Sequence, residues 1–308
     1  MEGKNLRTVY GETLAELGRE EERLVVLDAD LSGATMTKYF REAFPERFYD
    51  FGIAEMNLVC EAAGMALSGL KPFVSTFAMF GAGRAFEAIR NSVCYPELDV
   101  KFVFTHAGIS VGEDGGSHQC VEDIALMRVL PNMKVVVPCD GYETKKAVRA
   151  LTLEPGPVYL RLGRGGGSLV TEADSVFEIG KASVLKDGTD VVLIACGQMV
   201  WEALRAAEEL ERRGVSAAVV NMHTIKPLDA ACIRYYAGKC KKLITLEEHS
   251  IFGGLGSAVA EVVSACPGAE LKILGVRDSF GRSGPAQELL VRYGLTAKEI
   301  LTAWESMA

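Results

Sequence analysis

The chain has 308 residues, of which 49% are hydrophobic and 24% charged, and its formal net charge is −8. This length predicts two domains, each able to bury a core of its own. The apolar runs fall short of the about 18 residues that a membrane span needs. A negative net charge without a cluster of basic residues argues against a nucleic-acid partner.

The start of the chain and its cysteines indicate the compartment. The first residues, MEGKNLRTVYGETLAEL, are charged and amphipathic rather than signal-like, which predicts a cytoplasmic protein. The eight cysteines are scattered and form no C-x-x-C pair. We therefore expect reduced thiols in the core, and neither a disulfide framework nor a zinc site.

In the first half of the chain, short apolar runs alternate with helical patterns, which is typical of an α/β domain with a parallel sheet. We assign this predicted domain to residues 1–167. Its predicted strands are 23–28, 48–53, 71–76, 100–104, 133–138 and 158–162, and its predicted helices are 5–18, 54–70, 82–93, 142–153, one opening at 77–80 and one from about 121.

A weakly patterned, polar stretch over residues 168–188 is the predicted linker. A second α/β domain is then expected over residues 189–308. Helix 200–213 carries apolar residues on one face and is followed by Gly214, a common helix end. The other predicted elements are strands 190–195, 216–221, 242–246 and 271–276, and helices 229–237, 256–265 and 297–307.

Chemically versatile residues concentrate in the loop THAGISVGEDGGSHQ, residues 105–119, which follows a buried strand. Loops at the carboxyl ends of parallel strands bind ligands in open α/β sheets, and glycine permits close backbone approach. Imidazoles such as His106 and His118 exchange protons near neutral pH. The loop is thus a candidate active-site loop, although composition alone equally fits a solvated surface loop.

Other candidate residues also follow predicted strands. Glu55 opens an apolar helix, and its apolar neighbours predict that this carboxylate faces inward, where it needs a partner. The turn Asp30-Leu31 fits a helix cap, and Phe77 with Phe80 fits ordinary core packing. Arg164 precedes three glycines, but the segment lacks the Gly-Lys-Ser/Thr of a phosphate-binding P-loop.

Together these motifs resemble the transketolases, which use thiamine diphosphate to move two-carbon units between sugars. Gly52-Ile53-Ala54-Glu55 matches the motif whose glutamate bonds the N1′ atom of the aminopyrimidine and favours its imino tautomer. Phe77 and Phe80 match the wall on which that ring stacks, although Gly83 replaces a third aromatic found in many members. Asp30-Leu31 matches the turn that reaches the cofactor pocket.

The same resemblance implies substrate roles. His106 and His118 would position substrate hydroxyls and exchange protons with them, and Asp114 would bind the hydroxyl beside the carbonyl. Arg164 corresponds to an arginine that holds the sugar phosphate, a task suited to its fixed fork of donors. No metal ligand is assigned to this chain.

The resemblance covers the whole chain, but one family signature is missing. No Gly-Asp-Gly followed downstream by Asn occurs, and that motif holds Mg²⁺ and the diphosphate. The resemblance therefore implies the C-terminal subunit of a split transketolase: a pyrimidine-binding-type α/β domain followed by a C-terminal-type α/β domain. A partner N-terminal subunit would hold most of the Mg²⁺ site, in an α2β2 assembly acting on sugar phosphates.

Three alternatives stay open. A 1-deoxyxylulose-5-phosphate synthase shares the architecture, and Ile225–Asp229 is similar to it. The β subunit of a 2-oxo acid dehydrogenase E1 component shares the catalytic glutamate, but its loop normally lacks the Gly-Glu-Asp-Gly between histidines. A non-catalytic assembly subunit would not need intact Glu55, His106, Asp114 and His118.

His223 and His249 follow strands in the second half and are expected to be structural or interfacial.

Overall fold

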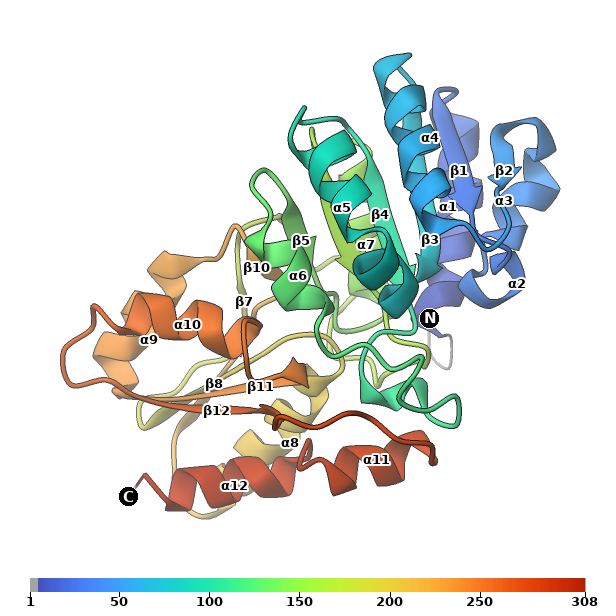
Figure 1. The fold of residues 1–308 in the computed structure, drawn as a ribbon. Helices are drawn as coiled ribbons and strands as arrows, with labels where there is room; N and C mark the ends of the chain where they lie inside the picture. Colours follow the sequence, from blue (N-terminus) through green and yellow to red (C-terminus); the bar gives the residue numbers. More distant parts are fainter. Residues whose placement is uncertain (1–4, 308) are drawn as a thin grey trace.

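A computed structural model describes residues 5–307, so the first four residues of the predicted first domain and Ala308 lie outside the described part. The described residues form two sheets with helices on both faces of each (Figure 1). This two-domain α/β architecture confirms the predicted fold class. None of the helices in the described residues is both long and apolar enough to cross a membrane.

The first sheet has seven strands in the order β10-β5-β6-β4-β3-β1-β2, parallel except for β10. Successive residues of a strand point to opposite faces of the sheet. Val25 and Leu27 therefore pack on one face, and Leu24 and Val26 pack on the other. The strands are β1 (Leu24–Asp28), β2 (Phe48–Asp50), β3 (Lys71–Phe77), β4 (Lys101–Thr105), β5 (Lys134–Val136), β6 (Val158–Arg161) and β10 (Thr224–Lys226).

Helices cover both faces of this sheet, so its strands are buried on both sides. α1 and α7 pack on one face, whereas α4, α5 and α6 pack on the other. The helices are α1 (Leu6–Glu20), α2 (Ser32–Thr35), α3 (Lys38–Ala43), α4 (Glu55–Leu67), α5 (Phe86–Ala88), α6 (Asp123–Val129) and α7 (Gly141–Leu151), with 3₁₀ turns η1 (Pro45–Arg47) and η4 (Ile109–Val111) and π-helical turns η2 (Met79–Arg84) and η3 (Ile89–Cys94).

The second sheet has five strands in the order β12-β11-β8-β9-β7, with β7 antiparallel. α8 and α12 pack on one face, and α9 and α10 on the other. The elements are β7 (Ser183–Lys186), β8 (Val191–Ala195), β9 (Ala217–Asn221), β11 (Lys242–Ser250), β12 (Glu270–Val276), α8 (Met199–Arg212), α9 (Ala230–Cys240), α10 (Leu255–Val263), α11 (Ala286–Arg292) and α12 (Ala297–Glu305).

Several elements differ from the sequence-based prediction. β7 lies within the predicted linker, and β10 comes from the second half of the chain but pairs with β5 of the first sheet. The strand expected over 48–53 ends at Asp50, whose carboxylate accepts hydrogen bonds from Asp30 N and Gly52 N. The helix expected from Phe77 is instead the end of β3 followed by π-helical turns.

The two domains are joined by buried polar contacts as well as by a shared apolar core. Arg161 donates to both carboxylate oxygens of Asp123 and to the backbone oxygen of Glu248 in the second domain. His249 Nε2 accepts from Ala125 N at 3.3 Å, also across the domains, and the His223 ring packs against Phe177 at a tilt of 32°, with centroids 4.4 Å apart. Burial of these contacts holds the domains in one arrangement.

Candidate active site

The candidate residues gather at the carboxyl edge of the first sheet. β1, β3 and β4 are neighbouring parallel strands, and Phe77 lies opposite Thr105 in their register. The turn after β1, the end of β3 and the loop after β4 therefore leave the sheet at the same edge, where open α/β sheets bind ligands. The sequence could predict this convergence because it follows from parallel topology.

Two histidines and two phenylalanines form one aromatic cluster. The His106 ring stacks on Phe77 with centroids 3.8 Å apart, and Phe77 stacks on Phe80 at 5.7 Å. His118 contacts both phenylalanines edge-on, at 6.3 and 5.3 Å. The structure thus places together His106 and His118 of the loop and the two aromatics predicted for the stacking wall.

His106 is held as a neutral imidazole. It is 3% exposed, and its Nδ1 lies 2.8 Å from the hydroxyl of Thr105. Burial, followed by the positive charges of Arg7 and Arg164 and by His118, lowers the pKa of His106 to about 3. At neutral pH this side chain therefore offers a hydrogen bond without carrying a charge.

Glu55 is buried at the start of α4, 4% exposed, as its apolar neighbours predicted. Its Oε1 pairs with Arg84 Nη1 at 2.9 Å. The same guanidinium lies 4.5 Å above the ring of Phe80. An open hollow of about 500 Å³ beside this pair is lined by Ala54, Glu55, Met56, Asn57 and Arg84.

On the opposite side of the cluster, Arg164 is bound to the loop. Its Nη1 donates to Val111 O at 2.6 Å and lies 3.3 Å from Glu113 and 3.9 Å from Asp114. The structure therefore brings together Arg164 and Asp114, two residues that the sequence analysis assigned to the substrate site. In this arrangement the loop's own carboxylates partly neutralise the guanidinium.

Arg7 is a candidate site residue that the sequence analysis did not identify. Its Nη1 donates to Ala34 O at 2.7 Å, while its buried Nε has no hydrogen-bond partner among the described residues. Burial, followed by the positive charge of Arg164, lowers the pKa of Arg7. Such a pair of guanidiniums favours a bound anion. In the sequence, Arg7 resembles any exposed charge of an amphipathic helix.

The turn after β1 is built by Asp28 rather than by Asp30. Asp28 is fully buried and accepts hydrogen bonds from Leu31 N and from the hydroxyls of Thr35 and Thr37. Burial raises the pKa of Asp28 to about 6. Asp30 is exposed, and in residues 5–307 no side-chain bond ties it to the aromatic cluster.

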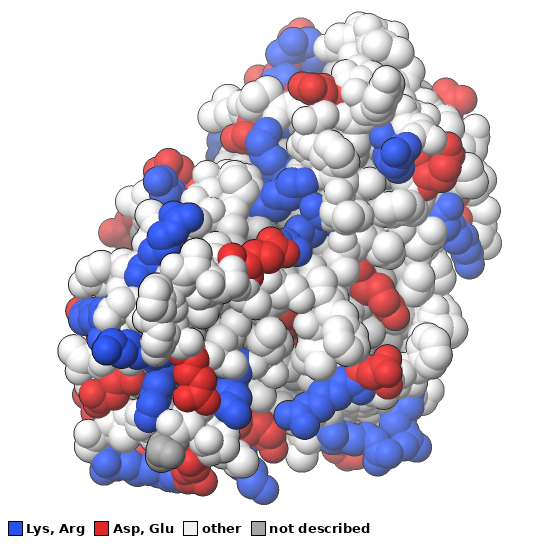
Figure 2. Space-filling view, turned by 60° about the vertical axis from the view of Figure 1, so that its left-hand side comes forward, with Lys and Arg blue, Asp and Glu red and all other residues white. Residues whose placement is uncertain are grey.

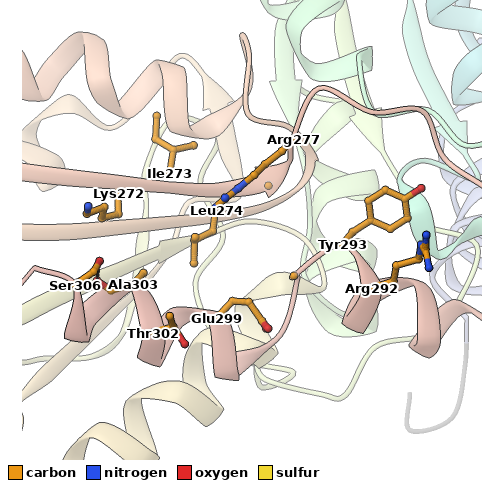
Figure 3. A pocket seen from close by; sticks show the side chains of 12 residues that line it. Lys272, Ile273, Leu274, Arg277, Arg292, Tyr293, Glu299, Thr302, Ala303 and Ser306 are labelled. Atoms are coloured by element: carbon orange, nitrogen blue, oxygen red, sulfur yellow. Dashed lines mark hydrogen bonds between the residues drawn. The ribbon is translucent and has the colours of Figure 1, made fainter.

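In the described part of the chain, no three His, Cys, Asp or Glu side chains are placed to hold a metal ion. Elsewhere on the surface, Figure 2 shows basic and acidic side chains interspersed over the face in view. Another open hollow, of about 450 Å³, lies between β12 and helices α11 and α12 (Figure 3). Its lining residues include none of those predicted for the site.

Comparisons with known proteins define the class. The family described as "Transketolase, pyrimidine binding domain" matches residues 2–167, and "Transketolase, C-terminal domain" matches residues 180–300. The chain belongs to the transketolase family. It corresponds to the C-terminal section of such an enzyme, with both domains in the family's order.

Two relatives and one solved structure align over nearly the whole chain. A protein named as a transketolase C-terminal section of Methanocaldococcus jannaschii is 53% identical, covering 96% of this chain and 94% of the relative. A 6-deoxy-6-sulfo-D-fructose transketolase subunit of Clostridium sp. (strain MSTE9) is 41% identical, covering 97% and 92%. The structure titled "Split gene transketolase, inactive beta4 tetramer" superposes with a TM-score of 0.92 at 50% identity, covering 99% and 98%.

The family implies thiamine diphosphate, and the residues present fit its aminopyrimidine. Glu55 uses one carboxylate oxygen toward Arg84, and an open hollow adjoins it. The Arg84 guanidinium that pairs with Glu55 lies over the ring of Phe80, which in turn stacks on Phe77. These residues therefore fit the aminopyrimidine part of the cofactor.

Proposed function

We propose that this chain is the C-terminal subunit of a thiamine diphosphate-dependent transketolase that requires an N-terminal partner subunit. It would transfer a two-carbon ketol unit from a ketose phosphate to an aldose phosphate. The observation that carries the proposal is the convergence of Glu55, the Phe77–Phe80 wall and both loop histidines at one sheet edge. A scaffold subunit would have no need of that convergence.

When bound, thiamine diphosphate supplies a carbon nucleophile that takes up the two-carbon unit. Glu55 would hold a proton at N1′ of the aminopyrimidine, with Phe77 and Phe80 packing against the ring. His106, kept neutral, and His118 would orient substrate hydroxyls, with His118 exchanging the proton. Asp114 would bind the hydroxyl beside the carbonyl, while Arg7 and Arg164 would face the terminal anion.

Exposed apolar residues support the requirement for a partner. Ile53 is 76% exposed and Met56 48% exposed, and both flank Glu55. Exposed apolar surface beside a polar site is typical of a protein–protein interface. The partner would carry the diphosphate and Mg²⁺ ligands, and two copies of each chain would assemble about a two-fold axis. The similar split-gene enzyme, solved as an inactive tetramer of β chains, supports this dependence.

Experiment has to determine which anionic group the substrate carries. Two arginines bind a phosphate or a sulfonate by the same donors, and one relative is named for a sulfo-sugar. The assay should therefore include both phosphorylated and sulfonated sugars as ketol donors.

The test mixes the chain with a candidate N-terminal subunit bearing Gly-Asp-Gly, in the presence of thiamine diphosphate and Mg²⁺. We expect coupled consumption of ketose phosphate and aldose phosphate by the mixture and none by either chain alone. Pyruvate consumption would instead indicate a synthase or dehydrogenase. A mixture that assembles but turns over no donor would indicate a non-catalytic subunit.

A further inference from the structure

Four glycines of the active-site loop lie against the second domain. A Cβ at Gly108 would collide with the Glu248 carboxylate, one at Gly115 would lie 2.5 Å from Ser283 Oγ, and one at Gly116 would lie 2.7 Å from the backbone oxygen of Gly281. Gly112 approaches the backbone of Gly284 and Ala286. These glycines therefore allow close domain packing, a role distinct from wrapping a ligand.

The contacting part of the second domain is the β12–α11 connection, residues 277–285. Tyr293, on the turn after α11 (Figure 3), donates its hydroxyl hydrogen to Phe280 O at 2.8 Å. This bond anchors the connection to its own domain. From there the chain runs past Gly281 and Ser283 along the active-site loop.

Gln119 joins the loop to this connection. Its amide nitrogen Nε2 donates to Ile109 O at 3.1 Å and Gly112 O at 3.2 Å within the loop. It also donates to Arg282 O at 2.9 Å in the connection. The side chain is 3% exposed, and its Oε1 is buried without a hydrogen-bond partner. Burying an unsatisfied oxygen costs free energy, whereas the two N–H groups of the amide are shared among three carbonyl oxygens.

The position of Gln119 gives these contacts a consequence for the site. It directly follows His118, and its own backbone N donates to Gly115 O at 3.0 Å, as His118 N does. The loop between the two histidines is thus closed at one end by Gln119 and supported from outside by the connection. On the far side of the loop, Glu248 of the second domain accepts from Ser110 N at 2.5 Å and from the amide of Gln198.

We propose that Gln119, held by the β12–α11 connection, is a positioning residue that sets the geometry of His118 and Asp114. The second domain thereby contributes to the substrate site in addition to any role in assembly. The inference rests on the proposed function for its catalytic consequence. A displacement of the loop by about 1 Å would cost on the order of a hundredfold in rate.

The principal test compares Gln119→Glu with Gly281→Ala. Gln119→Glu keeps the side-chain shape but replaces the donor amide by a carboxylate facing three carbonyl oxygens. Gly281→Ala acts from the second domain, because its Cβ would collide with Oε1 of Gln119. Gly238→Ala in α9 is the matched control, since nothing lies within 4 Å of its added Cβ.

In the assembled enzyme we expect both variants to lower kcat/KM for the sugar substrates roughly tenfold to a hundredfold. Cofactor affinity, measured by calorimetry, should stay within about twofold, because Glu55 and Phe80 lie outside these contacts. The double variant should lose little more than either single variant, since both break one contact. Unchanged kcat/KM, or a parallel loss of cofactor affinity, would overturn the proposal.

Amide hydrogen exchange on the chain tests the same contact without catalysis. Exchange should accelerate over residues 109–119 and 281–284 in both variants, while β4 stays protected. Acceleration throughout the first sheet, or none in the loop, would refute the positioning role. If no mixture transfers a ketol unit, the proposed function fails, whereas the exchange result still decides whether Gln119 orders the loop.

Discussion

Arg84 and Glu55 are joined at 2.9 Å, and the same guanidinium covers the ring of Phe80 at 4.5 Å. One side chain therefore links the buried carboxylate to the aromatic wall. Gly83, immediately before it, occupies the place where the resemblance implied a third aromatic, and a Cβ there would meet only the tip of Met79. We therefore propose that Arg84 takes part of the role that the missing ring would have.

Replacing Arg84 by Met tests this contact. The variant keeps an apolar stem over Phe80 but removes the charge that holds Oε1 of Glu55. We expect the assembled enzyme to bind thiamine diphosphate several-fold more weakly by calorimetry, consistent with about 1 kcal/mol for a half-exposed charged hydrogen bond. Tighter binding would show instead that the guanidinium competes for the aminopyrimidine's place.

Glu55→Gln should leave the fold intact, because the change is nearly isosteric, and remove most turnover. Loss of a proton-transfer group typically costs ~10²–10⁴-fold in rate. The measurement is kcat of the assembled enzyme, with sedimentation analysis as the control for unchanged assembly. Near wild-type kcat would disprove the assigned role of Glu55.

Arg7→Ala and Arg164→Ala should each raise KM for substrates with a terminal anion. An interaction made equally in the ground and transition states changes KM and leaves kcat unaltered. Arg19→Ala, an exposed position on the same helix as Arg7, is the matched control. Equal effects on phosphorylated and unphosphorylated acceptors would remove the anion-binding role from both arginines.

His118→Ala should mainly lower kcat, because its predicted proton exchange occurs in the transition state. His106, whose pKa burial lowers to about 3, should behave differently. An increase in KM with unchanged kcat for His118→Ala would assign that side chain to binding only.

The low pKa of His106 also predicts a pH-dependent stability. The ordinary pKa is 6.5, so between about pH 6.5 and 3 the unfolded chain binds a proton that the folded chain does not. The contribution of His106 is therefore fully present above pH 6.5 and declines as the pH falls. His106→Asn should show a smaller loss of Tm between pH 6.5 and 4.5 than the wild type, by differential scanning calorimetry. Identical slopes would contradict the buried neutral state.

The chain alone should bind thiamine diphosphate weakly and transfer no ketol unit. The carboxylate bond and the stacking wall would each contribute only ~1–3 kcal/mol, and most of the cofactor's charge lies in its diphosphate. Calorimetric titration with cofactor and Mg²⁺, before and after addition of the N-terminal subunit, measures the difference. Micromolar binding by the isolated chain would exclude the split-subunit proposal.

Local sequence patterns predicted those parts of the candidate site whose position follows from the parallel order of the strands. Glu55 is buried because it opens α4 on the same face as the buried Leu58 and Val59, and the two loop histidines lie after β4 at the ligand-binding edge. Such patterns could not predict which strands pair with strands far away in the sequence. β10 completes the first sheet from about 90 positions beyond β5, and β7 forms in a segment whose polar composition indicated only a linker.

The sequence by itself determined the two α/β domains, the buried glutamate, the aromatic pair and the active-site loop, because strand periodicity and motif spacing are local properties. Only the tertiary structure decided that the charge of Arg164 acts on Arg7, that Arg84 joins Glu55 to Phe80, and that Gln119 ties the loop to Arg282 O. Each depends on segments brought together by folding, up to 163 positions apart for Gln119 and Arg282. The sequence alone does not show whether an arginine or a glutamine will be exposed to solvent or will contact another segment. Only the packing of the folded chain decides which of the two occurs.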